Sequence, residues 1–339
     1  MRNAAVRDPF LRKVGMLRER ESTLSPPVTA GYDPNMASVA LPRTIFDESH
    51  DEFRDIVRKF VEREVVPNMD AWDAAGRVDR DLFRKAGETG MLGITAPEEF
   101  GGGGVDDFRY SVIVIEEFAR VGATAASMSI GGENDLIAPY FISFGNDEQN
   151  QRWLAPMLAG EKVGAIAMTE PGTGSDLAAI TTTARPDGDD FVVNGAKTFI
   201  SNGLLADFFI VAVRTDPEAG RHGISLLVVD ADTPGFTRSG PLKKIGLESQ
   251  DTAELSFADV RVPRANVLGG EGNGWKHMRH NLPIERMSIA VTSMARMRTT
   301  FEQALAYATE RQAFGTRIAD FQANRFYLEE LATEIEVTQ

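Results

Sequence analysis

The segment richest in potential chemistry is a glycine-containing loop, Glu170–Asp176, which follows a short apolar run. Pro171 fixes its own φ, while Gly172 and Gly174 accept backbone angles that other residues avoid. Such a loop can bring backbone N–H groups, and the threonine and serine hydroxyls beside it, against a flat or anionic ligand. An ordinary hairpin turn has the same Gly-x-Gly-Ser pattern, so the loop alone leaves both interpretations open. It is neither a P-loop nor the glycine fingerprint of a dinucleotide-binding βαβ unit.

A second segment, Lys197–Gly203, is predicted to be a strand that ends in a turn. Phe199 and Ser201 have the same strand parity, so both side chains are expected on one face. An aromatic ring beside a hydroxyl suits a planar heterocycle, because the ring packs on the heterocycle and the hydroxyl bonds to its edge. The alternative is a half-buried strand with Phe199 in the core.

Charged side chains stand near both ends of a long helix predicted from Pro283, in its first turn, to about residue 312. Glu285 is a candidate acid or base. A glutamate in a first turn also complements the helix dipole, and with Arg286 it could form only a surface pair. Arg311, at the other end, could bind a diphosphate with two hydrogen bonds or could simply cap the helix.

The composition argues against several classes of protein. The chain has 339 residues, of which 42% are hydrophobic and 25% charged, as in a globular protein. No apolar run approaches the ~18 residues of a transmembrane helix, so no membrane insertion is expected. A net charge of -14 argues against a nucleic acid or an anionic membrane surface as partner. With zero cysteines and four histidines in no metal-binding spacing, a metal site is not expected, and a cytoplasmic location is.

The first half of the chain is predicted to be an extension followed by helices. Residues 1–42, with several Arg and Pro, are expected to be a disordered or non-native extension. Apolar residues spaced at i, i+3 and i+4 then predict an N-terminal helical domain over residues 43–163. Its helices are expected near 46–66, 79–89, 106–120, 133–144 and 147–159, the second with Gly90 just beyond its end.

The hydrophobic period then changes from helical to strand-like and back. Short β-branched and aromatic runs predict a compact antiparallel β-domain over residues 164–270, in which Asn194-Gly195 is expected to form a hairpin turn. A C-terminal helical domain is expected over residues 271–339, with a break at Phe314-Gly315 and a final helix from about 319. The predicted fold class is therefore α+β, with helical, β and helical domains in that order.

Taken together and in this order, the motifs resemble the acyl-CoA dehydrogenase family over about residues 43–339. Ala167–Asp176 looks like the first signature of that family, and Arg311, Phe314-Gly315 and Gln322 look like the opening of the second. Leu-Pro-Ile-Glu-Arg at 282–286 and Gln250–Leu255 are similar to its long-chain-like subtype.

The resemblance implies that FAD lies between the β-domain and the C-terminal helices. Thr169 and Ser201 would hydrogen-bond the isoalloxazine ring. Arg311 and Gln322 would reach the FAD of a neighbouring subunit, since the family forms dimers and tetramers. The residues that would line the flavin are Ile166, Ala167, Met168, Thr169, Glu170, Pro171, Gly172, Thr173, Gly174, Ser175, Phe199, Ile200 and Ser201.

The resemblance also implies α,β-dehydrogenation of an acyl-CoA to trans-2-enoyl-CoA in fatty acid β-oxidation. A base removes the α-proton while hydride passes from Cβ to flavin N5, and an electron-transferring flavoprotein accepts the electrons. In the long-chain-like subtype the base is the motif glutamate, which is Glu285 here. Such a base needs a dry pocket, where desolvation raises the pKa of the carboxyl. Contacts to the acyl-CoA would come from Ser175, His222, Pro283 and Arg286.

Two glycines, Gly131 and Gly132, leave room beside the expected acyl pocket, so medium to long chains are predicted. Family members normally continue beyond the position of Gln339, so the chain is expected to be C-terminally truncated with an incomplete helical bundle. A non-catalytic remnant that binds acyl-CoA or a partner subunit is therefore an alternative, as is an acyl-CoA oxidase. A flavin monooxygenase fits less well, because it has no use for a base such as Glu285.

Overall fold

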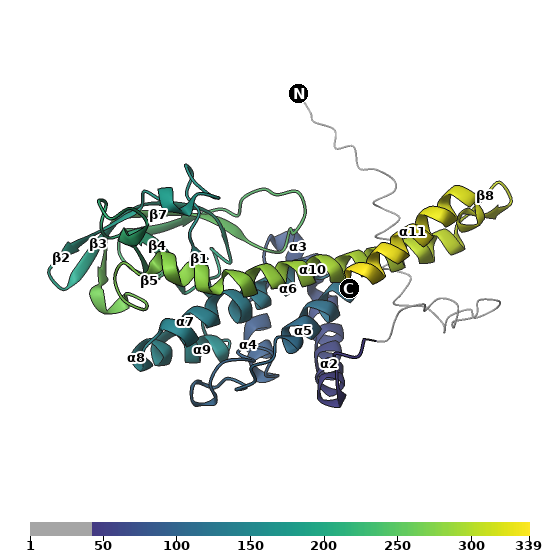
Figure 1. The fold of residues 1–339 in the computed structure, drawn as a ribbon, viewed down its shortest axis with the longest axis horizontal. Helices are drawn as coiled ribbons and strands as arrows, with labels where there is room; N and C mark the ends of the chain where they lie inside the picture. The colour runs from purple at the N-terminus through teal and green to yellow at the C-terminus, as the bar shows by residue number, and fades with distance from the viewer. Residues whose placement is uncertain (1–42) are drawn as a thin grey trace, which may run out of the picture. The chain divides into compact units, whose positions relative to one another are not determined.

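The computed structural model describes residues 43–339 and sets a group of helices against one β-sheet (Figure 1). The extension expected over residues 1–42 lies outside the described residues. Helices occur in each of the five predicted regions of the first half. They are α2 (Glu48–Phe60), α4 (Asp81–Glu88), α5 (Arg109–Arg120), α7 (Ala138–Phe144), α8 (Asp147–Gln149) and α9 (Ala155–Leu158). Two further helices, α3 (Met69–Ala75) and α6 (Thr124–Gly131), lie outside the predicted regions.

Local sequence determines where several of these helices begin, end or change pitch. The Asp47 side chain caps α2 by accepting hydrogen bonds from the backbone N–H groups of Ser49 and His50. As predicted, Gly90 follows α4 with a positive φ of 72°. Between α6 and α7 the chain winds as a wider π-helical turn, Gly132–Ile137, in which Glu133 and Asp135 are buried. Such turns often re-aim side chains at functional sites, and this one lies beside the sheet.

The sheet contains β1 (Gly164–Ala167), β2 (Thr183–Asp187), β3 (Asp190–Ser201), β4 (Phe208–Arg214), β5 (Ile224–Asp230), β6 (Phe236–Ser239) and β7 (Thr252–Pro263). The strand order is β1-β4-β2-β3-β7-β6, with β5 on β4. Most pairs are antiparallel, but β1 runs parallel to β4, with Gly164 opposite Phe208. The predicted antiparallel domain is therefore confirmed for most strand pairs, and the exceptions are β1 and a single parallel pair between β2 and β4. The strand β1 is not joined to β4 by a hairpin, because β2 and β3 intervene in the chain.

Asn194-Gly195 does not form the predicted hairpin turn, because both residues lie inside β3. The register with β7 shifts between Val193 and Gly195, so the pair forms a bulge. The Asn194 side chain holds this bulge by exchanging two 3.0 Å hydrogen bonds with Asp259. The β2–β3 hairpin instead turns at Gly188, which has a φ of 61°.

The central strand β4 joins two layers of core because its alternate side chains point to opposite faces. Phe208, Ile210 and Ala212 pack in a cluster with helix residues such as Phe141. The intervening residues Phe209, Val211 and Val213 pack among the other strands. Burial on both faces explains the continuous apolar run of β4. The sheet is thus fixed against the helices that carry the π-helical turn.

The last part of the chain contains α10 (Gly274–Glu310), β8 (Gln312–Ala313), β9 (Thr316–Arg317) and α11 (Gln322–Thr338). Pro283 lies inside α10 and not in its first turn, so that prediction is wrong. The helix begins at Gly274, nine residues before Pro283, and the proline ring is exposed on its surface. Phe314-Gly315 breaks the helix as predicted, through a tight turn between β8 and β9 with both φ values positive. In residues 43–339 no helix is long and apolar enough to cross a membrane.

Candidate active site

The two segments singled out in the middle of the sequence lie side by side. The Thr198 N–H donates to the Thr169 carbonyl at 2.9 Å. The Lys197 Nζ donates to the Met168 carbonyl at 3.0 Å and to Glu170 Oε1 at 2.9 Å. Strand β3 therefore fixes the backbone at the start of the glycine-containing loop, and the two segments form one continuous wall.

Glu170 is the buried anchor of that wall. Its Oε2 accepts from the Thr181 N–H at 2.6 Å and the Thr181 hydroxyl at 2.7 Å, and its Oε1 accepts from the Thr182 N–H at 2.9 Å. Burial raises the pKa of Glu170, but these hydrogen bonds and the positive charge of Lys197 outweigh burial and lower the pKa to about 2. Burial lowers the pKa of Lys197 to about 8 against the opposing effect of Glu170. The pair is ionised at neutral pH and ties the loop to β2 and β3.

Phe199 and Ser201 are both exposed, as predicted, while Ile200 between them is buried. Phe199 is 67% exposed, so the alternative with this ring in the core is wrong. The physical reason is local: Phe199 has a φ of 60°, and the β3–β7 register shifts between Lys197 and Ile200. A non-glycine residue held at positive φ is strained, and such strain is concentrated at ligand sites.

The wall offers open space, an exposed aromatic ring and an exposed hydroxyl group. A Cβ added to Gly172 would meet no atom within 4 Å, so the loop leaves open space beside it. The exposed ring of Phe199 offers an apolar surface, and the exposed Ser201 adds a hydroxyl group. These residues fit a planar, partly polar heterocycle such as the isoalloxazine ring of FAD.

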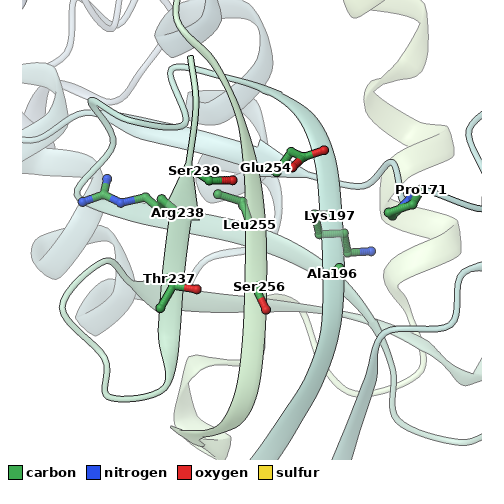
Figure 2. A pocket seen from close by; sticks show the side chains of 9 residues that line it. All are labelled: Pro171, Ala196, Lys197, Thr237, Arg238, Ser239, Glu254, Leu255 and Ser256. Carbon is green, nitrogen blue, oxygen red and sulfur yellow. The ribbon is translucent and has the colours of Figure 1, made fainter. Parts of the chain in front are cut away.

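A cavity of about 200 Å³ adjoins this wall over strands β3, β6 and β7 (Figure 2). Pro171 and Lys197 border it on the side of the glycine-containing loop. The Arg238 side chain points away from it and donates from Nη1 to the Leu204 and Ala206 carbonyls, at 3.0 and 2.8 Å. Lys197 Nζ, beside the loop, and Arg238 Nη1, on the opposite side, are therefore both already engaged in hydrogen bonds within the chain.

Glu285 lies on α10, away from the first turn in which it was predicted, so it does not complement the dipole there. Its carboxylate is mostly shielded from water, and its Oε1 accepts a hydrogen bond from the Tyr140 hydroxyl at 3.1 Å. Burial raises the pKa of Glu285, opposed by the Tyr140 hydrogen bond and by the charge of Arg286. A carboxyl with a raised pKa in a partly dry site can act as a proton acceptor near neutral pH.

The helices around Glu285 are tied together by residues that the sequence analysis did not identify. Asp135, in the π-helical turn, accepts from Ser288 Oγ at 2.8 Å and from Ser111 Oγ at 2.9 Å. Glu133 accepts from the Gly164 N–H at 3.1 Å and so links the same turn to β1. The only signal in the sequence is the run of polar residues Glu133–Asp135 ahead of an apolar helix, and this run does not indicate which residues they contact.

Other predicted site residues lie elsewhere on the chain. His222, Pro283 and Arg286 are exposed, and within residues 43–339 none of them hydrogen-bonds to Glu285 or to the wall. Arg311 and Gln322 lie at the far end of α10, where β8 is seen in Figure 1. Arg311 follows Glu285 by 26 residues, which is about 39 Å of helix. One chain therefore does not bring Arg311 and Gln322 to the wall formed by its own loop and β3.

Models of one family match most of the chain. They are the acyl-CoA dehydrogenase N-terminal domain over residues 47–161, the middle domain over 165–260 and the C-terminal domain over 272–339. The long-chain specific acyl-CoA dehydrogenase, mitochondrial, of Sus scrofa is 44% identical over 299 residues, which are 88% of this chain and 69% of that protein.

Solved structures agree with these matches. The crystal structure of an acyl-CoA dehydrogenase from Geobacillus kaustophilus has a TM-score of 0.84 and 45% identity, over 87% of this chain and 78% of that one. A glutaryl-CoA dehydrogenase from Mycobacterium smegmatis in complex with FADH2 has a TM-score of 0.79 and 28% identity, over 86% and 74%. The three family models, the flavin-compatible wall and these structures show that the chain belongs to the acyl-CoA dehydrogenase family, a family of FAD-dependent oxidoreductases.

Proposed function

We propose that the protein oxidises medium- to long-chain acyl-CoA thioesters to trans-2-enoyl-CoA, with Glu285 as the base that removes the α-proton. The observation that carries this proposal is the setting of Glu285, a mostly buried carboxyl whose pKa is raised by burial. The α-proton of a thioester is weakly acidic, so its acceptor must hold a proton more strongly than an ordinary carboxylate. Among the site residues predicted from the sequence, Glu285 has that property, whereas Glu170 has the opposite one.

The wall formed by residues 166–175 and 199–201 is proposed to bind FAD, which supplies the hydride acceptor when bound. Thr169 and Ser201 would donate to the ring edge, and Phe199 would pack on its face. Arg311 and Gln322 are proposed to reach the FAD of a second subunit, because they lie far from the wall of their own chain. A homodimer or homotetramer is therefore part of the proposal, as is a division into domains 43–163, 164–270 and 271–339.

The acyl chain is proposed to pass beside Gly131, where an added Cβ would meet no atom within 4 Å. Ser175, His222, Pro283 and Arg286 are proposed contacts to the CoA part, and an electron-transferring flavoprotein is the proposed acceptor. Rates measured for thioesters from C4 to C18 test the chain length. A Gly131→Leu variant should lose activity on the longest chains first, and an optimum at C4 in the natural protein would contradict this part of the proposal.

The main test is the variant Glu285→Gln, with Glu302→Gln as control because Glu302 is exposed on the same helix. The control should retain wild-type activity. Glu285→Gln should keep the flavin absorbance of bound FAD but lose turnover by on the order of 100-fold or more. Near wild-type turnover in Glu285→Gln would overturn the role of Glu285.

The alternative functions have tests of their own. Peroxide formation with acyl-CoA and oxygen alone would assign an oxidase, and absence of flavin binding would favour a non-catalytic remnant. The cytoplasmic location stays a prediction from the sequence.

A further inference from the structure

The proposed base is held by a side chain from another helix. The Tyr140 hydroxyl of α7 donates to Glu285 Oε1 at 3.1 Å, across 145 positions of sequence. Among the described residues, none donates a hydrogen bond to the second oxygen, Oε2. We propose that Tyr140 is a positioning residue for the reaction: it anchors one oxygen of Glu285 and leaves the other to accept the α-proton. This inference rests on the proposed function of Glu285.

Tyr140 is suited to this role because it is rigidly placed. Its side chain is fully buried, and its ring lies 6.4 Å from that of Phe144. One turn beyond Glu285, Ser288 Oγ donates to Asp135 Oδ2 at 2.8 Å, and Asp135 belongs to the turn that leads into α7. Residues three apart share a helix face, so both contacts join the same face of α10 to the same neighbouring segment. The two hydrogen bonds fix the register of α10 against that segment, and with it the place of the carboxylate.

The hydroxyl remains a donor throughout the working pH range. Burial and the nearby Glu285 charge raise the pKa of Tyr140 far above its usual range. In the proposed step the proton leaves the substrate Cα for Glu285 Oε2, the electron pair stays on the substrate, and Tyr140 keeps its proton. The titratable groups that act on Glu285 are Tyr140 from α7 and Arg286 from α10. Of these, Tyr140 is the one in direct contact.

Removing the hydroxyl should change the pH dependence of the reaction more than its maximum. Tyr140→Phe keeps the ring but removes a donor that favours the ionised carboxylate, so the pKa of Glu285 should rise further. Because the base must be deprotonated, the acidic limb of kcat/KM should move to higher pH by about one unit. On the acidic limb the rate should then fall by up to about tenfold, while the plateau at high pH stays within a few-fold of wild type.

The experiment compares pH profiles of the FAD-loaded wild type, Tyr140→Phe, Tyr110→Phe and Glu285→Gln. Tyr110 is a matched control, because its hydroxyl contacts Ser49 at 3.0 Å and not Glu285. An upward shift in Tyr140→Phe alone supports the inference. If Glu285→Gln is inactive and Tyr140→Phe has the wild-type profile, the inference is overturned and the proposed function stands. If Glu285→Gln is active, both fail.

A second measurement does not depend on turnover. Thermal unfolding without substrate should show that Tyr140→Phe loses more stability at pH 8 than at pH 5, because the hydroxyl stabilises the ionised carboxylate more than the neutral one. The pH dependence of that loss should vanish in the double variant with Glu285→Gln, because no carboxylate remains to be stabilised. A loss that is the same at both pH values, with or without Glu285→Gln, would mean that the hydroxyl acts only in packing and would overturn the inference.

Discussion

The regions around Glu170 and Glu285 both bury a glutamate, yet they move its pKa in opposite directions. Glu170 lies in the wall made by β2, β3 and the glycine-containing loop, and its pKa falls to about 2. Glu285 lies between α10 and α7, and its pKa rises. Burial raises the pKa in both places. What differs is the number and charge of the donors.

Glu170 accepts from two N–H groups, one hydroxyl and the Lys197 ammonium, whereas Glu285 accepts from the Tyr140 hydroxyl. A carboxylate with many donors stays ionised at neutral pH and has a structural role. A carboxylate with one donor keeps an affinity for protons and can act as a base. Donor count therefore separates a residue that builds the site from one that works in it, even though both lie in motifs of the same family.

The largest expected effect comes from removing the charge opposite Glu170. Lys197→Met leaves a buried anion without its ion pair, so the free energy of unfolding should fall by about 3–5 kcal/mol. Urea denaturation at pH 7 measures this. Lys85→Met is the control, since Lys85 pairs with Glu64 and Asp81 at a partly exposed site and its loss should change stability little. Equal effects in the two variants would mean that burial of the Lys197–Glu170 pair is not what stabilises the wall.

The second prediction uses the opposite pKa directions. The pKa of Glu170 is depressed on folding, so its contribution to stability is present above about pH 4.5 and is lost as the pH falls towards 2. From the shift, that contribution is about 3 kcal/mol. The pKa of Glu285 is raised, so its contribution is present at acid pH and is lost as the pH rises through the folded-state value.

Thermal unfolding between pH 3 and pH 8 tests both predicted directions of the pH dependence of stability in one series. Glu170→Gln should be less stable than wild type at pH 7, with the difference shrinking towards pH 3. Glu285→Gln should match or exceed wild type at pH 7, by a margin that grows with pH. If the two variants follow parallel curves, donor count does not distinguish the two glutamates.

Much of the fold could be predicted because it is encoded locally. Helical periodicity placed α2 and α5, and Pro171 with its neighbouring glycines marked the loop that meets β3. Local signals failed where pairing between segments distant in the sequence determines the structure. Asn194-Gly195 is typical of a hairpin turn, but its hydrogen bonds with Asp259 of β7 hold it as a bulge. The parallel pairing of β1 and β4 likewise depends on two strands that no hairpin connects.

The site could be predicted only in part for the same reason. Glu285 stands in a recognisable motif, but Tyr140 is 145 positions away in an apolar helix, and nothing in its neighbours marks it. The positive φ of Phe199 is also invisible locally, because phenylalanine rarely adopts it and the β3–β7 register imposes it. Chemistry that resides in one segment can be identified from the sequence, whereas chemistry made by two segments cannot.

The smallest expected effect concerns Asp135. In number of donors it lies between Glu170 and Glu285, because two hydroxyl groups, and no cation, donate to it. Burial raises the pKa of Asp135 against those two hydrogen bonds. Ser288→Ala removes one of them and should lower the free energy of unfolding by about 1 kcal/mol at pH 7. The loss should be smaller at pH 4, where the carboxyl is closer to neutral and depends less on donors. Ser293→Ala is the matched control, because its hydroxyl bonds to an exposed carbonyl of the same helix. If Ser288→Ala is as stable as this control at pH 7, the hydroxyl of Ser288 does not stabilise the Asp135 carboxylate. The number of donors would then not explain the behaviour of a carboxylate intermediate between Glu170 and Glu285.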